Sequence, residues 1–222
     1  MRCLAAVSVS LALAGCAVTS ERPLFTAADA AAHPLAQGDW ALHGPGCEVA
    51  PGQPPPECAI ALTVRGDRMI AGGDAGVMAS LGPMAAATGG GGPAGTSEFV
   101  LAEGDPQVLQ LHELAKPAAA DGQAPATPQK PGHRSYMAFR PLHQNAEGRS
   151  DRGILWLILC PKDAAAAPGI TTGLQGCEAT TPQAVLDQAK HVPPMFSFFM
   201  TWIGPGAAPA QSGAMPGAKP GA

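Results

Sequence analysis

Apolar and polar residues alternate along the chain in short runs, and Gly, Pro or Asp separates most of these runs. In the segment Ala59–Arg65, the residues Ile60, Leu62 and Val64 share one face, which is typical of a half-buried β-strand. Gly66-Asp67 then predicts a two-residue hairpin turn, with Gly in its first position. The same pattern predicts further strands over residues 38–43, 68–71, 77–81, 97–103, 107–114, 134–143, 153–160 and 196–203.

One segment near the C-terminal end has helical signals instead. Thr181 can cap a helix and Pro182 suits its first turn. Residues 184–190 continue the helix, and Pro193-Pro194 ends it. Taken together, these elements predict a mostly β domain, an antiparallel β-barrel or β-sandwich of about eight short strands with one late helix.

The composition limits how much of the chain can belong to this domain. Of 222 residues, 28 are Gly and 24 are Pro, while charged residues make up 14%. Segments rich in Gly, Pro and Ala bury too little apolar surface to offset the entropy lost on ordering them. We therefore expect flexible insertions at 83–96 and 117–132 and a disordered tail over 204–222. A single domain is therefore expected over 37–203. The net charge of −4 provides no basic surface for nucleic acid.

The N-terminal residues carry a targeting pattern. A positive charge at Arg2 is followed by an apolar run over 4–14, which is too short to span a bilayer. The run ends in Leu13-Ala14-Gly15-Cys16, which resembles a bacterial lipobox. The resemblance implies a signal peptide over 1–15, a diacylglyceryl or palmitate-bearing Cys16, and a lipidated tether over 16–36. Lipoproteins kept in the inner membrane usually carry Asp directly after the lipidated cysteine, whereas this chain has Ala17 and Val18 there. By this resemblance, the protein is expected in the outer membrane, facing the periplasm.

Four further cysteines remain for the mature chain: Cys47, Cys58, Cys160 and Cys177. An even number in an oxidising compartment predicts disulfides, and local pairing, Cys47–Cys58 and Cys160–Cys177, is the simplest of three connectivities. A metal site and free thiols are the alternatives. The metal site is disfavoured, because the sequence lacks the Cys-x₂-Cys spacing that zinc sites usually have.

Two groups of aromatic residues are candidates for core packing or for lining a ligand site. Gly38-Asp39-Trp40 resembles the Gly-x-Trp that opens the first strand of lipocalin-like barrels. In the last predicted strand, Phe196, Phe198, Met200 and Trp202 share one face, and core packing is the default interpretation for such a face.

Motifs for catalysis are not evident in the sequence. It contains no Gly-x-Ser-x-Gly and no Ser-x-x-Lys, its histidines have no metal-ligand spacing, and the carboxylates Glu98, Glu103 and Asp105 form a local cluster. We therefore expect no catalytic residues, no metal and no cofactor.

The chain also resembles uncharacterised outer-membrane lipoproteins of alphaproteobacteria. The resemblance rests on the lipobox, on Pro23-Leu24-Phe25 with Asp29, on Gly38-Asp39-Trp40, and on Cys47 and Cys58-Ala59. It implies a location in the cell envelope and no particular activity.

The leading hypothesis is a non-catalytic envelope lipoprotein, a structural or interaction module. Its partners would be the membrane, through its lipid anchor, and possible envelope proteins. The alternative is a small apolar-ligand carrier with a lipocalin-like barrel.

Overall fold

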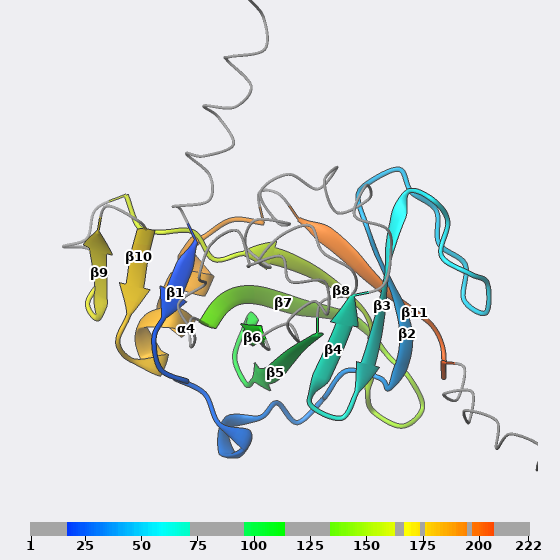
Figure 1. Cartoon of the computed structure of the whole chain (residues 1–222), viewed down its shortest axis with the longest axis horizontal. Coiled ribbons are helices and arrows are strands. Elements are labelled where there is room, and N and C mark those ends of the chain that lie inside the picture. Colours follow the sequence, from blue (N-terminus) through cyan, green and yellow to red (C-terminus); the bar gives the residue numbers. More distant parts are fainter. Residues whose placement is uncertain are drawn as a thin grey trace, which may run out of the picture.

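The computed structural model describes residues 17–71, 96–113, 134–162, 167–173, 176–194 and 197–206. Its centre is a closed antiparallel barrel of eight strands (Figure 1). The strands follow one another around the ring in the order β6-β5-β4-β3-β2-β11-β8-β7, and pairing of β6 with β7 closes it. The predicted mostly β fold is thus confirmed, as a barrel rather than a sandwich. The barrel strands are β2 (Gly38–His43), β3 (Ala59–Arg65), β4 (Arg68–Ala71), β5 (Thr96–Ala102), β6 (Gln107–Glu113), β7 (Arg134–Gln144), β8 (Ser150–Leu157) and β11 (Phe198–Gly204).

The alternation seen in the sequence decides which side chains fill the barrel. Successive residues of a strand point to opposite faces, so every second residue enters the interior. Cross-strand partners agree with this rule, since Trp40 lies opposite Leu62 on β3 and opposite Trp202 on β11. The buried interior cluster is made of Trp40, Leu42, Ile60, Leu62, Val64, Met69, Leu101, Leu109, Leu111, Met137, Phe139, Leu155, Leu157 and Met200, joined by Ala31, Leu35 and Ala36.

Most predicted elements occur within a few residues of their expected bounds. The strands over 38–43, 59–65 and 68–71 are confirmed as predicted, and the turn is confirmed by Gly66 at φ +59°. The helix α4 (Pro182–His191) begins where predicted, because Thr181 Oγ1 accepts a hydrogen bond from Ala184 N at 3.2 Å. β8 begins three residues earlier than expected. Residues 77–81, 83–95, 117–132 and 207–222 lie outside the described residues, while Thr96 and Gly204, expected in an insertion and in the tail, belong to β5 and β11.

Three short strands extend the sheet beyond the barrel and were not predicted. They are β1 (Val18–Ser20), β9 (Ile170–Gly173) and β10 (Gly176–Ala179). β1 pairs with β7 where β8 has ended, β10 pairs with β1 in parallel, and β9 forms the outer edge.

The expectation of a tether over 16–36 is wrong from Ala17 onward. Residues 17–36 pack against the barrel, because their few apolar side chains find buried positions on it. Val18, Phe25 and Leu35 are each no more than 3% exposed. A 3₁₀ turn, η1 (Ala27–Asp29), lies between Phe25 and Leu35 and is capped by Thr26.

The segment 30–37 closes one end of the barrel. It runs from β5 to β8: Ala31 N donates to Leu101 O at 2.7 Å, and Ala36 N donates to Ser150 O at 2.9 Å. Leu35 and Ala36 are each 2% exposed and belong to the interior cluster. This closed end lies at the bottom of Figure 1, where the blue N-terminal segment passes beneath the strands.

A second core lies on the outer face of β6, β7 and β8. The helix α4 contributes Ala184, Val185 and Ala189, while β1 and β10 contribute Val18 and Cys177. These residues cover Trp156, Tyr136 and Val108 of the barrel wall. The wall is therefore buried on both faces in this region.

Candidate functional site

Two tryptophans from neighbouring strands lie at the closed end of the barrel. Trp40 is fully buried, and its Nε1 donates to Ala36 O at 2.9 Å. Trp202 is half-buried, packs against the same interior cluster, and its Nε1 donates to Gln37 O at 2.9 Å. Both indoles thus fix the segment that closes the barrel, and Trp40 occupies the core rather than a ligand site.

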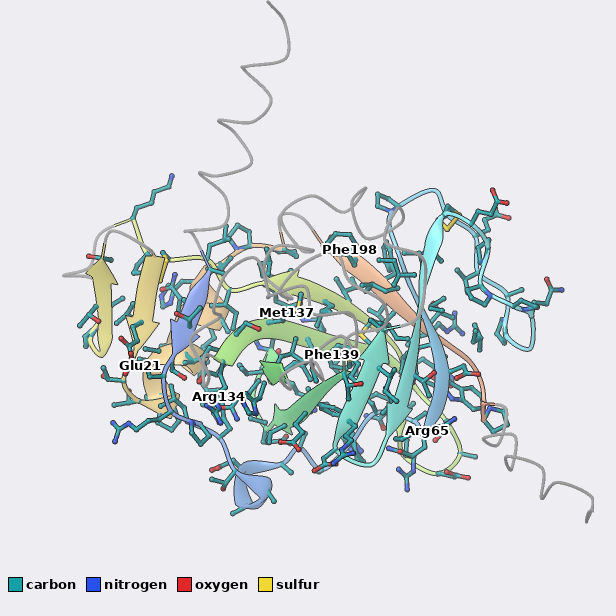
Figure 2. All side chains as sticks on the ribbon, in the orientation of Figure 1. Glu21, Arg65, Arg134, Met137, Phe139 and Phe198 are labelled. Atoms are coloured by element: carbon teal, nitrogen blue, oxygen red, sulfur yellow. A yellow bond between two sulfur atoms is a disulfide. The ribbon has the colours of Figure 1, made fainter. Side chains whose placement is uncertain are left out.

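The opposite end of the barrel, which we call the mouth, has a different lining. β2, β4, β6 and β8 end there, and β3, β5, β7 and β11 begin there. Three apolar residues at this end pack against the interior cluster but remain half-buried: Ala71, Leu159 and Phe198. We call them the mouth residues. Figure 2 shows Phe198 at the upper end of β11, with Met137 and Phe139 further along the barrel. The interior beneath them is filled by buried side chains.

The loop between β2 and β3 carries the first disulfide and folds away from the mouth. Cys47 and Cys58 are bonded, which confirms the predicted pair. The loop returns along the outer wall, since Gly52 N donates to Ile203 O at 2.8 Å. Cys47 and Val49 pack on Ala41 and Ile203 of that wall. The middle of the loop therefore lies on the side of the barrel, while Glu57 stays next to the start of β3 at the mouth.

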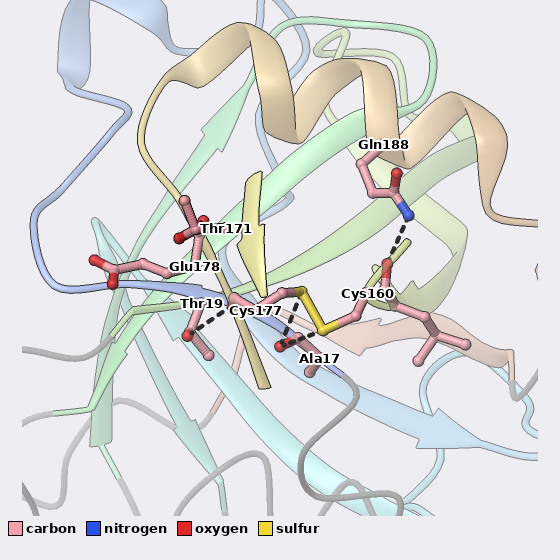
Figure 3. The surroundings of a disulfide bond; sticks show 8 residues. Ala17, Thr19, Cys160, Thr171, Cys177, Glu178 and Gln188 are labelled. Carbon is pink, nitrogen blue, oxygen red and sulfur yellow. Dashed lines mark hydrogen bonds between the residues drawn. A yellow bond between two sulfur atoms is a disulfide. The ribbon is translucent and has the colours of Figure 1, made fainter. Parts of the chain in front are cut away.

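The second disulfide joins Cys160, just beyond β8, to Cys177 on β10, which confirms the other predicted pair (Figure 3). Both sulfurs lie near Ala17 O, at 3.7 Å for Cys160 and 4.0 Å for Cys177. Bonded sulfurs carry no hydrogen to donate, so these are close packing contacts. Ala17 also forms an antiparallel bridge with Leu159, a mouth residue. The disulfide thus holds the start of β1 at the rim of the mouth.

Buried polar groups fix the N-terminal segment on the outer wall. The Oε1 of Gln110 accepts from Leu24 N at 2.8 Å and from Phe25 N at 3.0 Å, and its Nε2 donates to Phe25 O at 3.0 Å. The Tyr136 hydroxyl is hydrogen-bonded to Ser20 Oγ, and both residues are buried. Burial raises the pKa of Tyr136 above its ordinary value, although the Ser20 hydrogen bond and the charge of Arg134 act in the opposite direction.

The carboxylates that cluster in the sequence are engaged separately in the structure. Glu98 lies 3.8 Å from His112 across β5 and β6, while Asp105 lies 3.9 Å from Arg140. Glu103 accepts from Ala32 N at 2.9 Å and so helps to fix the closing segment. Their geometry indicates structural contacts at the barrel surface.

Other polar groups do not converge on a common point. A close pair joins His143 Nδ1 to Asp151 at 2.6 Å, at the surface of the β7–β8 hairpin. Within the part of the chain that the structure describes, no three His, Cys, Asp or Glu residues are grouped to hold a metal. Buried side-chain atoms without a hydrogen-bond partner there are His43 Nδ1, Gln107 Oε1 and Trp156 Nε1, which lie on three separate strands.

The candidate site is therefore the mouth, and sequence reasoning identified it only in part. Phe198 was among the predicted ligand-lining or core residues and is a mouth residue. Trp40 and Trp202 lie at the other end, and Phe196 and Cys16 lie outside the described residues. Leu159 was not singled out, because residues 154–160 form a continuous apolar run in which no alternation marks the inward-facing side chains.

Comparisons with known proteins found no relative of this chain. The chain matches no protein-family profile, no curated protein and no solved structure. Among the described residues, no helix has the length and apolar character needed to cross a membrane.

Proposed function

We propose that this protein is a lipid-anchored protein of the cell envelope whose barrel serves as a binding module, with no catalytic role. The anchor is a diacylglyceryl group on Cys16, and the outer membrane, facing the periplasm, is the compartment. Support for the anchor comes from the sequence Leu13-Ala14-Gly15-Cys16 behind an apolar run of signal-peptide length. The two disulfides are in keeping with an oxidising compartment.

The observation that carries the binding role is the difference between the two ends of the barrel. The segment 30–37 fills the closed end, whereas Ala71, Leu159 and Phe198 stay half-buried at the mouth. Half-buried apolar side chains gain free energy when an apolar group covers them, at about 25 cal/mol per Å². An eight-stranded barrel has room for little more than its own side chains or one small ligand. The mouth therefore suits a shallow apolar ligand, as in a lipocalin-like carrier.

The anchor is tested by labelling cells with radioactive palmitate. We expect the wild-type protein to take up label and Cys16→Ser to take up none, because the acceptor sulfur is gone. Cys3→Ser is the matched control, since it removes a cysteine of the predicted signal peptide and should label like wild type. Label on Cys16→Ser would exclude the proposed anchor.

The ligand is tested on a chain that starts at Ala17 after an unrelated cleavable signal, which keeps every described element. Lipid extraction and mass spectrometry should recover an apolar ligand in a fixed ratio to protein. Phe198→Arg should reduce the recovered amount several-fold, because it places a charge among the mouth residues. Leu142→Arg is the control, because Leu142 is 55% exposed and lies on the part of β7 near the closed end, away from the mouth. Equal recovery from both variants would contradict binding at the mouth.

A further inference from the structure

The junction between the proposed anchor and the barrel is rigid. Ala17, the residue directly after Cys16, bridges Leu159, and Val18 N donates to Ile158 O at 2.9 Å. The Cys160–Cys177 disulfide lies against Ala17 O on both of its sulfurs (Figure 3). Val18 itself is 0% exposed. One residue of extended chain spans at most about 3.6 Å, so no spacer separates Cys16 from the folded domain.

This junction lies at the mouth and not at the closed end. Its bridge partner Leu159 follows β8 at the end where that strand leaves the barrel, and Leu159 is itself a mouth residue. In Figure 1, β1 begins at the upper end of the molecule, and the segment 30–37 passes beneath its lower end. Barrel strands of six or seven residues separate the two ends by about 20 Å.

The two ends also differ in polarity. The turns at the closed end carry charged and polar residues at their tips, whereas the mouth combines the half-buried Leu159 and Phe198 with the exposed charged residues Glu57 and Lys162. Burying charges in a low-dielectric medium is costly, while covering apolar surface is favourable. The closed end therefore suits water, while the mouth suits the boundary between hydrocarbon and the charged headgroups. The charged residues of the closed-end turns are Arg65, Asp67, Arg68, Glu103, Asp105, Glu147 and Arg149.

We propose that the mouth is seated on the lipid surface of the membrane that holds the Cys16 anchor, so that acyl chains of that bilayer cover Leu159 and Phe198. The closed end and its charged turns point into the periplasm. This inference rests on the proposed lipidation of Cys16. It deepens the proposed function, because the apolar ligand of the mouth is then a lipid of the same bilayer.

The test uses the full-length acylated protein in vesicles whose phospholipids carry a photoreactive diazirine near the end of one acyl chain. After illumination, crosslinked peptides are mapped by mass spectrometry. We expect several-fold more crosslinks at Leu159 and Phe198 than at Leu142, which belongs to the opposite half of β7. Equal crosslinking at both ends, or more at Leu142, would overturn the proposal that the mouth lies on the membrane surface.

A spacer variant isolates the role of the rigid junction. Inserting about eight Gly/Ser residues between Cys16 and Ala17 adds a flexible reach of roughly 15 Å. We expect the excess of crosslinks at the mouth to fall markedly, since the barrel can then leave the surface. An unchanged excess would overturn the role assigned to the junction.

The same samples distinguish the two proposals from each other. Palmitate label on Cys16 without crosslinks at the mouth would leave the anchor standing and reject the orientation. Absence of label on Cys16 would reject both, because the orientation depends on the anchor.

Discussion

Tyr136 is the single tyrosine of the chain, and its burial makes it a direct reporter of the outer core. Desolvation disfavours the charged phenolate, which is why burial raises the pKa of this residue above its ordinary value of about 10. Its hydroxyl joins β7 to Ser20 of β1, so its ionisation is linked to packing of the N-terminal segment.

We expect the Tyr136 phenolate to appear, on titration followed by ultraviolet absorbance, at higher pH in the folded protein than in denaturant. Because the folded pKa is raised, the folded state holds its proton after the unfolded state has lost it. The contribution to stability is therefore complete below about pH 10 and is lost as the pH rises through the folded pKa. If the phenolate appeared at the same pH in the folded and the denatured protein, Tyr136 would be exposed in the folded state.

The two closed-end tryptophans should differ in their contributions to stability. Trp40→Ala removes a fully buried indole and should lower the free energy of unfolding by about 3–5 kcal/mol. Trp202→Ala removes a half-buried indole and should cost about 1–2 kcal/mol, because part of its surface already contacts water. Urea unfolding measures both values. Equal costs would contradict the burial difference described above.

At the scale of elements, the sequence predicts a strand or helix where several residues repeat one period. Ile60, Leu62 and Val64 identify β3, and Thr181 with Pro182 identifies the start of α4. β9 and β10 have four residues each, which is too short for a period-two pattern to stand out in the sequence. Residues 17–36 look like a tether because their apolar residues are widely spaced, and residues distant in sequence, Gln110 and Tyr136, fix Leu24 and Phe25 to the barrel.

The two disulfides should stabilise the protein by different amounts. Their cysteines are separated by 11 and 17 residues, so loop-closure entropy gives each about 3 kcal/mol. Cys177 is 3% exposed and packs with Val18, whereas Cys58 is exposed. Replacing Cys160 and Cys177 together by Ser should therefore lower stability more than replacing Cys47 and Cys58.

Thermal unfolding of the two double variants under non-reducing conditions measures this difference. Hydrogen exchange should also show faster exchange at the Val18 amide only when Cys160 and Cys177 are replaced. If the Cys47 and Cys58 variant were the less stable one, the role of the second disulfide in holding β1 would be refuted.

At the scale of the whole molecule, closure of the sheet gives the protein two unlike ends. Closure depends on pairing β6 with β7, whose residues are brought together across a long connection, and sequence patterns do not predict such a register. For the same reason the sequence left barrel and sandwich open, and did not indicate that Leu159 and Phe198 would lie at the same end. If Cys16 is lipidated as we propose, this asymmetry places the mouth, and not the closed end, beside the anchor.

Lipidation of Cys16 underlies both proposals, and tandem mass spectrometry of the N-terminal peptide from membrane-extracted protein tests it most directly. We expect residues 1–15 to be absent, and the mature chain to begin at Cys16 with a thioether-linked diacylglyceryl group. A chain that retains its first residues, or begins elsewhere with Cys16 absent or unmodified, would contradict the account. The proposed seating of the mouth on the membrane would then lose its basis as well.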